Sequence, residues 1–342
     1  MAYSSIVKPT DYFNTKLHTG NGSTQSITGV GFQPDFTWIK DRSGGNDHQI
    51  VDAVRGATKA LSSNRNDSAT HADGLTSFDS DGYSLGNNTR YNGSSTNYVG
   101  WNLKANGAGS SNTDGSVTST VSANTTSGFS IVSYTGTGSN ATVGHGLSVA
   151  PDVVLIKGRS NTDNWFMKHP SLNANQYLYL NDTASVRSGN NVWNNTNPDA
   201  TKIYVGTDGG VNGNGTTYVG YAWTQKKGYS KFGSYTGNGS TNGAFAYTGF
   251  KPAFVMIKTN TDSGEWAMFD NKRNIGNETA DVLRANSNSA ESDSTGNNSI
   301  DILSNGFKVK GTGGWVGTNG RGFIYMAFAE APFVANNSGT AV

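Results

Sequence analysis

The segment His18-Thr19-Gly20-Asn21-Gly22-Ser23 decides how this chain is organised, because it occurs three times. It returns as Tyr134-Thr135-Gly136-Thr137-Gly138-Ser139 and as Tyr235-Thr236-Gly237-Asn238-Gly239-Ser240. After each copy comes a proline and then an apolar run that ends in Ile-Lys: Pro34 with Trp38-Ile39-Lys40, Pro151 with Leu155-Ile156-Lys157, and Pro252 with Met256-Ile257-Lys258. The prolines recur about every hundred residues, the length of a small β-sandwich domain. The sequence therefore predicts three tandem repeats.

Each repeat also closes on a similar strand-like segment, at Tyr98-Val99-Gly100-Trp101, Tyr218–Trp223 and Phe323–Phe328. The stretch between the proline and this segment differs in length among the copies, whereas the stretch before the proline hardly varies. Insertions are tolerated where loops meet water, because solvent satisfies their backbone groups. We therefore expect differences in binding between the repeats to lie in the loops of their second halves.

The composition favours short strands and many turns, with 45 glycines and few strong helix formers. Asp81-Gly82 and Asn305-Gly306 are matching hairpin turns in the first and third repeats. We predict an all-β fold of three tandem antiparallel jelly-roll, concanavalin-like β-sandwich modules. The predicted boundaries are an N-terminal arm at 1–11, extended around Pro9, repeat 1 at 12–105, a linker and strand with repeat 2 at 106–227, repeat 3 at 228–335, and a tail at 336–342. The linker up to Gly115 is expected to be flexible, and Ser116–Val121 is expected to be the opening strand of repeat 2.

Charge and cysteine content exclude several classes of protein. The net charge is +1 and only 14% of residues are charged, so no basic patch predicts a nucleic-acid partner. No apolar run is long enough to span a bilayer, and the N-terminus does not resemble a signal peptide. Cysteine is absent, which excludes disulfides and suits folding in a reducing cytosol.

Catalytic patterns are weak when they are compared among the repeats. The five histidines share no repeat position, and glutamate occurs only at Glu265, Glu278, Glu291 and Glu330. A glycoside hydrolase needs two facing carboxyl groups, for which Glu265, Glu330 or the pair Asp79 and Asp81 are the candidates. We expect a protein that is not an enzyme and has no cofactor, with a glycan-degrading enzyme as the lesser alternative.

Asp79 and Asp81 also form a weak candidate for a calcium site, since carboxylates are calcium ligands. The equivalent segment of the third repeat, Leu303-Ser304-Asn305-Gly306, lacks both carboxylates. A turn is the better interpretation, and we predict no metal site.

Two arginines at equivalent places, Arg55 and Arg273, are candidates for binding a glycan or a partner's carboxylate. The plainer alternative is that each arginine ties a turn to a nearby carbonyl group.

The aromatic residues divide into two groups. Trp101, Trp165, Trp223 and Trp266 fall at strand positions and are predicted to lie in the core. Tyr91, Trp193 and Trp315 lie in the variable halves among Asn and Gly, where exposed rings could stack on sugars. The alternative is that these three rings pack against a neighbouring module or subunit.

Several long segments resemble a repeat domain of bacteriophage proteins, especially those of marine phage. They are Asn112–Ser116 with Thr118–Asn124, Gly128–Val132, Val143–Leu147, Gly228–Gly239, Ile300–Phe307 and Ala327–Phe333. The resemblance implies a tail-fibre-like or other virion surface protein with concanavalin-like sandwich domains, and it implies no catalytic residues. A coiled-coil or β-helical shaft, which a long tail fibre would have, is not evident in this sequence.

We therefore expect a virion protein, made in the cytoplasm of the host bacterium, that contacts other tail or capsid proteins and binds host-surface polysaccharide. The alternative is a capsid decoration or other particle-stabilising protein that does not touch a receptor. We also expect a homo-oligomer, for which a trimer is one option.

Overall fold

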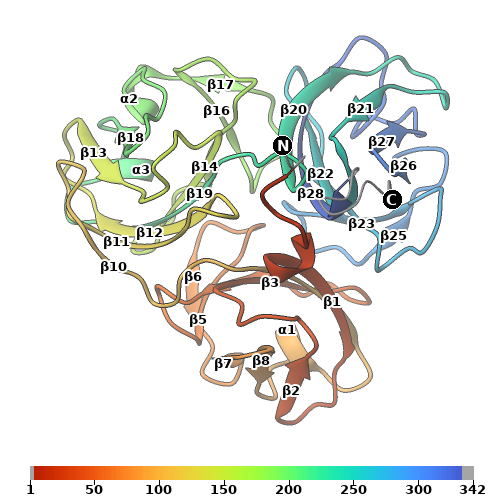
Figure 1. Cartoon of the computed structure of the whole chain (residues 1–342), viewed down its shortest axis with the longest axis horizontal. Helices are drawn as coiled ribbons and strands as arrows, with labels where there is room; N and C mark the ends of the chain where they lie inside the picture. Colours follow the sequence, from red (N-terminus) through yellow and green to blue (C-terminus); the bar gives the residue numbers. More distant parts are fainter. Residues whose placement is uncertain (1–3, 333–342) are drawn as a thin grey trace.

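The computed structural model describes residues 4–332 and is almost entirely antiparallel β-structure, which confirms the predicted all-β sandwich class. Three lobes surround a common centre (Figure 1). We call residues 13–103 lobe 1, residues 110–223 lobe 2 and residues 230–332 lobe 3. Every sheet takes its strands from one lobe.

Lobe 1 has a six-stranded sheet in the order β1-β9-β3-β4-β5-β6 and a three-stranded sheet in the order β2-β8-β7. Its elements are β1 Phe13–Thr19, β2 Gln25–Thr28, β3 Phe36–Asp41, β4 Gln49–Asp52, β5 Lys59–Leu61, β6 Ser68–Thr70, β7 Leu75–Asp79, β8 Gly82–Leu85, α1 Thr89–Asn92 and β9 Asn97–Leu103.

Lobe 2 has an eight-stranded sheet in the order β10-β11-β12-β19-β14-β15-β16-β17 and the pair β13-β18. Its elements are β10 Ser110–Asn112, β11 Ser119–Asn124, β12 Phe129–Thr135, β13 Ala141–Gly144, β14 Val153–Gly158, β15 Phe166–Lys168, β16 Gln176–Tyr179, β17 Arg187–Ser188, α2 Asn190–Trp193, β18 Lys202–Val205, α3 Gly209–Asn212 and β19 Thr217–Trp223.

Lobe 3 repeats the plan of lobe 1, with the orders β20-β28-β22-β23-β24-β25 and β21-β27-β26. Its elements are β20 Ser230–Thr236, β21 Phe245–Tyr247, β22 Phe250–Thr259, β23 Ala267–Asp270, β24 Asp281–Arg284, β25 Ser292–Asp293, β26 Ile300–Leu303, β27 Gly306–Val309 and β28 Gly322–Pro332.

The large sheet of each lobe is buried on both faces, which explains why its central strands are continuous apolar runs. In β3, Ile39 packs against the small sheet of its own lobe, whereas the adjacent Trp38 points to the centre of the molecule. Successive side chains of a strand point to opposite faces. Each Ile-Lys run therefore supplies residues to two cores at once.

One central apolar core joins the three lobes. It contains Phe36 and Trp101 of lobe 1, Leu155 of lobe 2, and Phe254 and Met326 of lobe 3. Trp165, Trp223 and Trp266 belong to the same cluster. The prediction that these tryptophans and Trp101 are core residues is confirmed, and the core that they form is shared between lobes.

The connecting segments differ from the expectation. The arm, predicted to be extended around Pro9, forms a 3-10 turn, η1 Pro9–Asp11, and its Ile6 is buried in the central core. The linker, predicted to be flexible, forms β10, which pairs with β11. The N–H groups of Ala105 and Gly107 donate to Asp35, which fixes the start of the linker.

The strand expected at Ser116–Val121 begins later, as β11 Ser119–Asn124. The predicted tail at 336–342 lies outside the described residues. Within the described residues, no helix is long and apolar enough to cross a membrane.

Candidate functional site

Three side chains at one repeat position join the lobes into a closed ring. His48, Trp165 and Trp266 each lie at the end of a loop, immediately before β4, β15 and β23 respectively. Their ring N–H groups meet backbone carbonyl oxygens of the neighbouring lobe, and the acceptors are also equivalent. His48 Nε2 lies 3.0 Å from Arg284 O, Trp165 Nε1 lies 2.9 Å from Ser62 O, and Trp266 Nε1 lies 2.9 Å from Tyr179 O.

The buried histidines are neutral and structural. The Nδ1 atom of His48 accepts a hydrogen bond from Trp38 Nε1 at 2.8 Å, so the proton of the imidazole is on Nε2, facing Arg284 O. His169 is arranged alike, with Nδ1 accepting from Ser171 N–H and Nε2 facing Tyr325 O of lobe 3. Burial lowers the pKa of His169 to about 4 and the pKa of His48 well below its usual value.

Arg55 lies inside the contact between lobes 1 and 2. Its Nε donates to Asp52 Oδ2 at 2.5 Å, and the hydroxyl of Tyr221 donates to the same oxygen at 2.7 Å. Its Nη2 donates to Ile50 O at 3.0 Å. The guanidinium side chain is buried, so the prediction that Arg55 binds a glycan is wrong and the plainer alternative holds.

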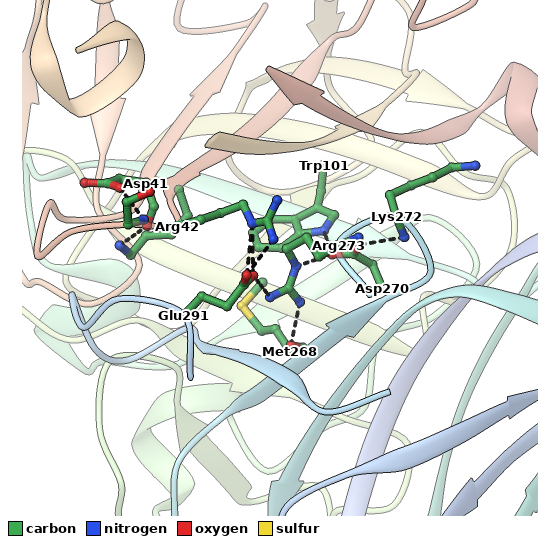
Figure 2. Close-up of polar contacts among 10 residues, drawn as sticks. Asp41, Arg42, Trp101, Met268, Asp270, Lys272, Arg273 and Glu291 are labelled. Atoms are coloured by element: carbon green, nitrogen blue, oxygen red, sulfur yellow. Dashed lines mark hydrogen bonds and ion pairs between the residues drawn. The ribbon is translucent and has the colours of Figure 1, made fainter. Parts of the chain in front are cut away.

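Arg273 occupies the equivalent place between lobes 3 and 1, as Figure 2 shows. It donates to Asp270 Oδ2 at 2.6 Å and to Met268 O at 2.8 Å. Its Nη1 donates to Glu291 Oε2 at 2.8 Å, and the other oxygen of Glu291 accepts from Arg42 Nη2 of lobe 1 at 2.6 Å. The prediction that Arg273 binds a glycan is therefore also wrong, because its side chain is buried and carboxylates of the chain itself accept from it.

Two of the three rings that were expected to be exposed are buried. Tyr91, on α1, packs in the core of lobe 1 and donates its hydroxyl to Gln49 Oε1 at 3.1 Å. Trp193, on α2, packs in the core of lobe 2. Short helices under the small sheets carry these rings inward, and the neighbouring Asn and Gly residues did not reveal this. The expectation of exposure is wrong for both.

Trp315 is half-buried against the core of lobe 3. The guanidinium of Arg284 lies over its ring, 5.4 Å from the centroid, which is cation–π geometry. The chain itself thus covers one face of this ring. Stacking of Trp315 on a sugar stays a prediction.

The oxygens of Asp79 and Asp81 are used within lobe 1. Asp79 accepts from the hydroxyls of Ser77 and Ser84, and Asp81 accepts from the N–H groups of Gly29 and Gly31. Among the described residues, no group of three or more His, Cys, Asp or Glu side chains could hold a metal ion. The turn interpretation accounts for both carboxylates.

The lysines of the Ile-Lys motif end in buried carbonyl groups. Lys40 Nζ donates to Asp41 O at 2.5 Å, Lys157 Nζ to Gly158 O at 2.6 Å, and Lys258 Nζ to Thr259 O at 2.9 Å. Burial lowers the pKa of each to about 8. They hold the ends of the central strands in all three lobes.

The surface of lobe 3 carries the clearest candidate for a binding site. Phe245 and Tyr247 on the edge strand β21 are 46% and 54% exposed, while Ala246 between them is buried. Both rings therefore project from the outer face of the small sheet. Tyr247 also borders a hollow of about 570 Å³, lined by Gln225, Lys227, Ser230, Lys231, Tyr247, Thr248 and Gly249.

The other lobes do not have these rings at the equivalent positions. In lobe 3, Ala246 pairs with Phe307, and in lobe 1 Ile27 pairs with Tyr83, which also follows the hairpin turn. Phe245 and Tyr247 thus correspond to the exposed Ser26 and Thr28. The fold tolerates small polar residues at these positions, so sheet formation does not require the rings of lobe 3.

Lobe 2 covers the same place with its own chain. Thr142 and Gly144 flank Val143, which pairs with Ile203. The preceding segment lies along this edge, where Val117 N–H donates to Thr142 O at 3.0 Å and Ser119 Oγ to Gly144 O at 3.2 Å. Among the described lobes, only lobe 3 carries aromatic residues on this edge strand. Sequence reasoning missed it, although Phe245-Ala246-Tyr247 differs visibly from Ser26-Ile27-Thr28.

Fold and surface together define the chain as an antiparallel β-sandwich protein of three lobes with one exposed aromatic face on lobe 3. The chain belongs to a protein family described as a domain of unknown function (DUF7483), whose model matches residues 8–332. No curated protein and no solved structure matches the chain.

Proposed function

We propose that this chain is a bacteriophage virion surface protein, a tail fibre or tail appendage, that binds host-surface glycan through the outer face of lobe 3. The observation that carries the proposal is the pair of exposed rings, Phe245 and Tyr247, beside a hollow with amide, hydroxyl and ammonium groups. Aromatic faces pack on the apolar faces of sugars, and polar groups around them take the hydroxyls.

The assignment to a phage particle rests on the resemblance of the repeat segments to phage virion proteins. A binding function is favoured over a catalytic one, because the candidate acid and base side chains are engaged in contacts within the protein. Glu265 accepts from Asn286 Nδ2, and Glu330 pairs with Lys251 at 2.8 Å. The buried histidines and arginines hold lobes together. Among the described residues, the exposed rings of Phe245 and Tyr247 on β21 make no contact of this kind between lobes.

Adsorption of the phage tests the proposal. We would replace Phe245 and Tyr247 with the residues of lobe 1, as the double variant F245S/Y247T, and follow adsorption of phage carrying it. We expect adsorption to fall by at least about tenfold, the effect of losing roughly 1.4 kcal/mol of binding. The control is V149T, which removes apolar surface at a valine that is 49% exposed in lobe 2.

Normal adsorption of the double variant, with the protein present in the particle in normal amounts, would overturn the proposal. So would purified wild-type protein that neither binds host cells nor competes with the phage for them.

A structural protein of the capsid or tail is the second candidate, and one observation favours it. The segment at Val117 shows that this fold accepts a polypeptide along the edge equivalent to β21. A virion protein could lie on β21 in the same way. A cryo-EM reconstruction of the virion decides: a few copies at the tail with β21 outward support the adhesin, and many copies on the capsid with β21 covered support decoration.

A further inference from the structure

We propose that the ligand of the lobe 3 face is an acidic polysaccharide, one that carries carboxylate or sulfate groups. Phe245 and Tyr247 stack on its sugar rings, while Lys231 and Lys308 pair with its anionic groups. This inference rests on the proposed function and narrows it from glycan in general to one chemical class.

The two rings lie on the same face of β21. Residues two apart on a strand lie roughly 7 Å apart on the same face. This face continues sideways, because Lys308 of β27 pairs directly with Phe245. Directly opposed residues of an antiparallel pair share a face. The ammonium group of Lys308, which is hydrogen-bonded to Asn242 Oδ1, therefore belongs to the face that carries the rings.

Lysine side chains line the hollow beside Tyr247. Lys227 and Lys231 line it, and the described lining residues include no carboxylate. The carboxyl group of Asp152 lies outside this lining but interacts with Lys231 from nearby, and its Oδ2 accepts the N–H of Gln225 at 2.7 Å. Burial also raises the pKa of Asp152. Lys231 and Lys308 thus lie on two sides of the aromatic pair. Asp301 pairs directly with Lys308 from the strand on its other side, and its carboxylate also lies 3.8 Å from Lys310 Nζ. Lysines therefore outnumber carboxylates around the two rings.

A second hollow on lobe 3 lacks this character. It is about 420 Å³ in volume and is lined by Lys251, Lys272 and Glu330 among other residues. The carboxylate of Glu330 lies 2.8 Å from Lys251 Nζ and 3.9 Å from Lys272 Nζ. One carboxylate therefore lies against both cations of this hollow, whereas the described lining of the hollow beside Tyr247 includes none.

The comparison between lobes supports the same choice. β20 and β1 are equivalent first strands, and Lys231 pairs with Ala327 of the closing strand as Asn14 pairs with Asn102. Lobe 1 thus carries Asn14, Ser26 and Thr28 where lobe 3 carries Lys231, Phe245 and Tyr247. One cation and two rings appear together on a strand framework that lobe 1 forms without them. A site for a ligand with both apolar sugar faces and negative charge explains all three differences.

The test measures binding of the purified full chain to polysaccharides by affinity electrophoresis and calorimetry. The anionic probes are polygalacturonate and chondroitin sulfate, and the neutral probe is dextran. Three proteins are compared: the wild type, K231N and F245S/Y247T, whose new residues are those of lobe 1. Thermal unfolding of each protein is the control for folding. We expect similar unfolding temperatures, because all three replaced residues lie at the surface.

We expect wild-type protein to bind at least one anionic probe and to lose about tenfold or more in affinity between roughly 0.01 M and 1 M salt, since screening weakens exposed charge pairs. K231N should lose about tenfold for the anionic probe at low salt. F245S/Y247T should lose binding at every salt concentration.

The outcomes separate the two proposals. Equal binding of anionic and neutral probes, without a salt effect and without an effect of K231N, would overturn the acidic ligand and leave the glycan function intact. Binding to host cells that F245S/Y247T does not reduce would overturn both. If none of the probes binds and F245S/Y247T instead fails to enter the particle, the occupant of β21 is a polypeptide and the acidic-glycan inference is wrong.

Discussion

The indole Nε1 of Trp101 donates to Oδ2 of Asp270 at 3.0 Å, across the contact between lobe 1 and lobe 3. An equivalent bond joins lobe 2 to lobe 1, where the Tyr221 hydroxyl meets Asp52 at 2.7 Å. In both, the carboxylate also holds the arginine three residues further along the chain. These contacts place residues from the end of one repeat against the middle of another, so the closed ring of lobes depends on long-range polar pairs as well as on the central core.

Replacing Asp270 with asparagine should destabilise the protein by about 3 kcal/mol, since it removes charge that compensates the buried Arg273. Urea unfolding of D270N and wild type measures the difference. The exposed pair of Lys8 and Asp11 supplies the control, D11N, for which we expect less than about 1 kcal/mol. Equal effects of the two variants would show that the buried contact contributes nothing special.

Two tryptophans of lobe 2 test the value of the bonds between lobes. Trp165 and Trp193 are both buried, but Trp165 Nε1 donates to Ser62 O, whereas Trp193 Nε1 has no acceptor among the described residues. Both W165F and W193F lose ring volume. W165F alone leaves a carbonyl of the next lobe without its donor, so we expect it to be more destabilising by about 1–2 kcal/mol in thermal or urea unfolding. A larger loss for W193F would contradict this role.

Acid should destabilise the folded protein, because histidines that are neutral in the folded state lie at the contacts between lobes. The folded state keeps His169 neutral down to a pKa of about 4, whereas the unfolded chain protonates near pH 6.5. Between these values the unfolded state binds more protons, so the free energy of unfolding falls as the pH falls, by up to about 1.4 kcal/mol per pH unit for this residue. H169Q keeps a donor for Tyr325 O but does not titrate. Its unfolding free energy should therefore depend less steeply on pH in this range, and identical slopes would refute the assignment.

The bridge at Glu291 should couple lobes 1 and 3 energetically. Glu291 is held by Arg42 of lobe 1 and by Arg273 of its own lobe. A double-mutant cycle on R42A and E291A should give a coupling free energy above about 1 kcal/mol, within the usual range for residues in one network. The same cycle on the exposed pair Arg65 and Asp67 should give less. A coupling near zero for Arg42 and Glu291 would mean that the bridge is incidental.

Much of the architecture could be read from the repeats. The hairpin turns at Asp81-Gly82 and Asn305-Gly306 precede β8 and β27 as predicted, and the tryptophans assigned to strands are buried. The prediction failed for Tyr91 and Trp193, because a polar neighbourhood in sequence does not reveal the direction in which a one-turn helix points its ring.

The sequence by itself determined the all-β class, the repeat positions and the strands, because turn residues and alternating apolar residues act over a few neighbours. Only the tertiary structure decided that Arg55 and Arg273 are buried, because an aromatic residue of another lobe lies against each: Tyr221 against Arg55 and Trp101 against Arg273. It also decided that Phe245 and Tyr247 remain uncovered where lobe 2 lays its own chain across the edge. These properties depend on the docking of segments that lie far apart in the chain, and local sequence does not encode which of them meet.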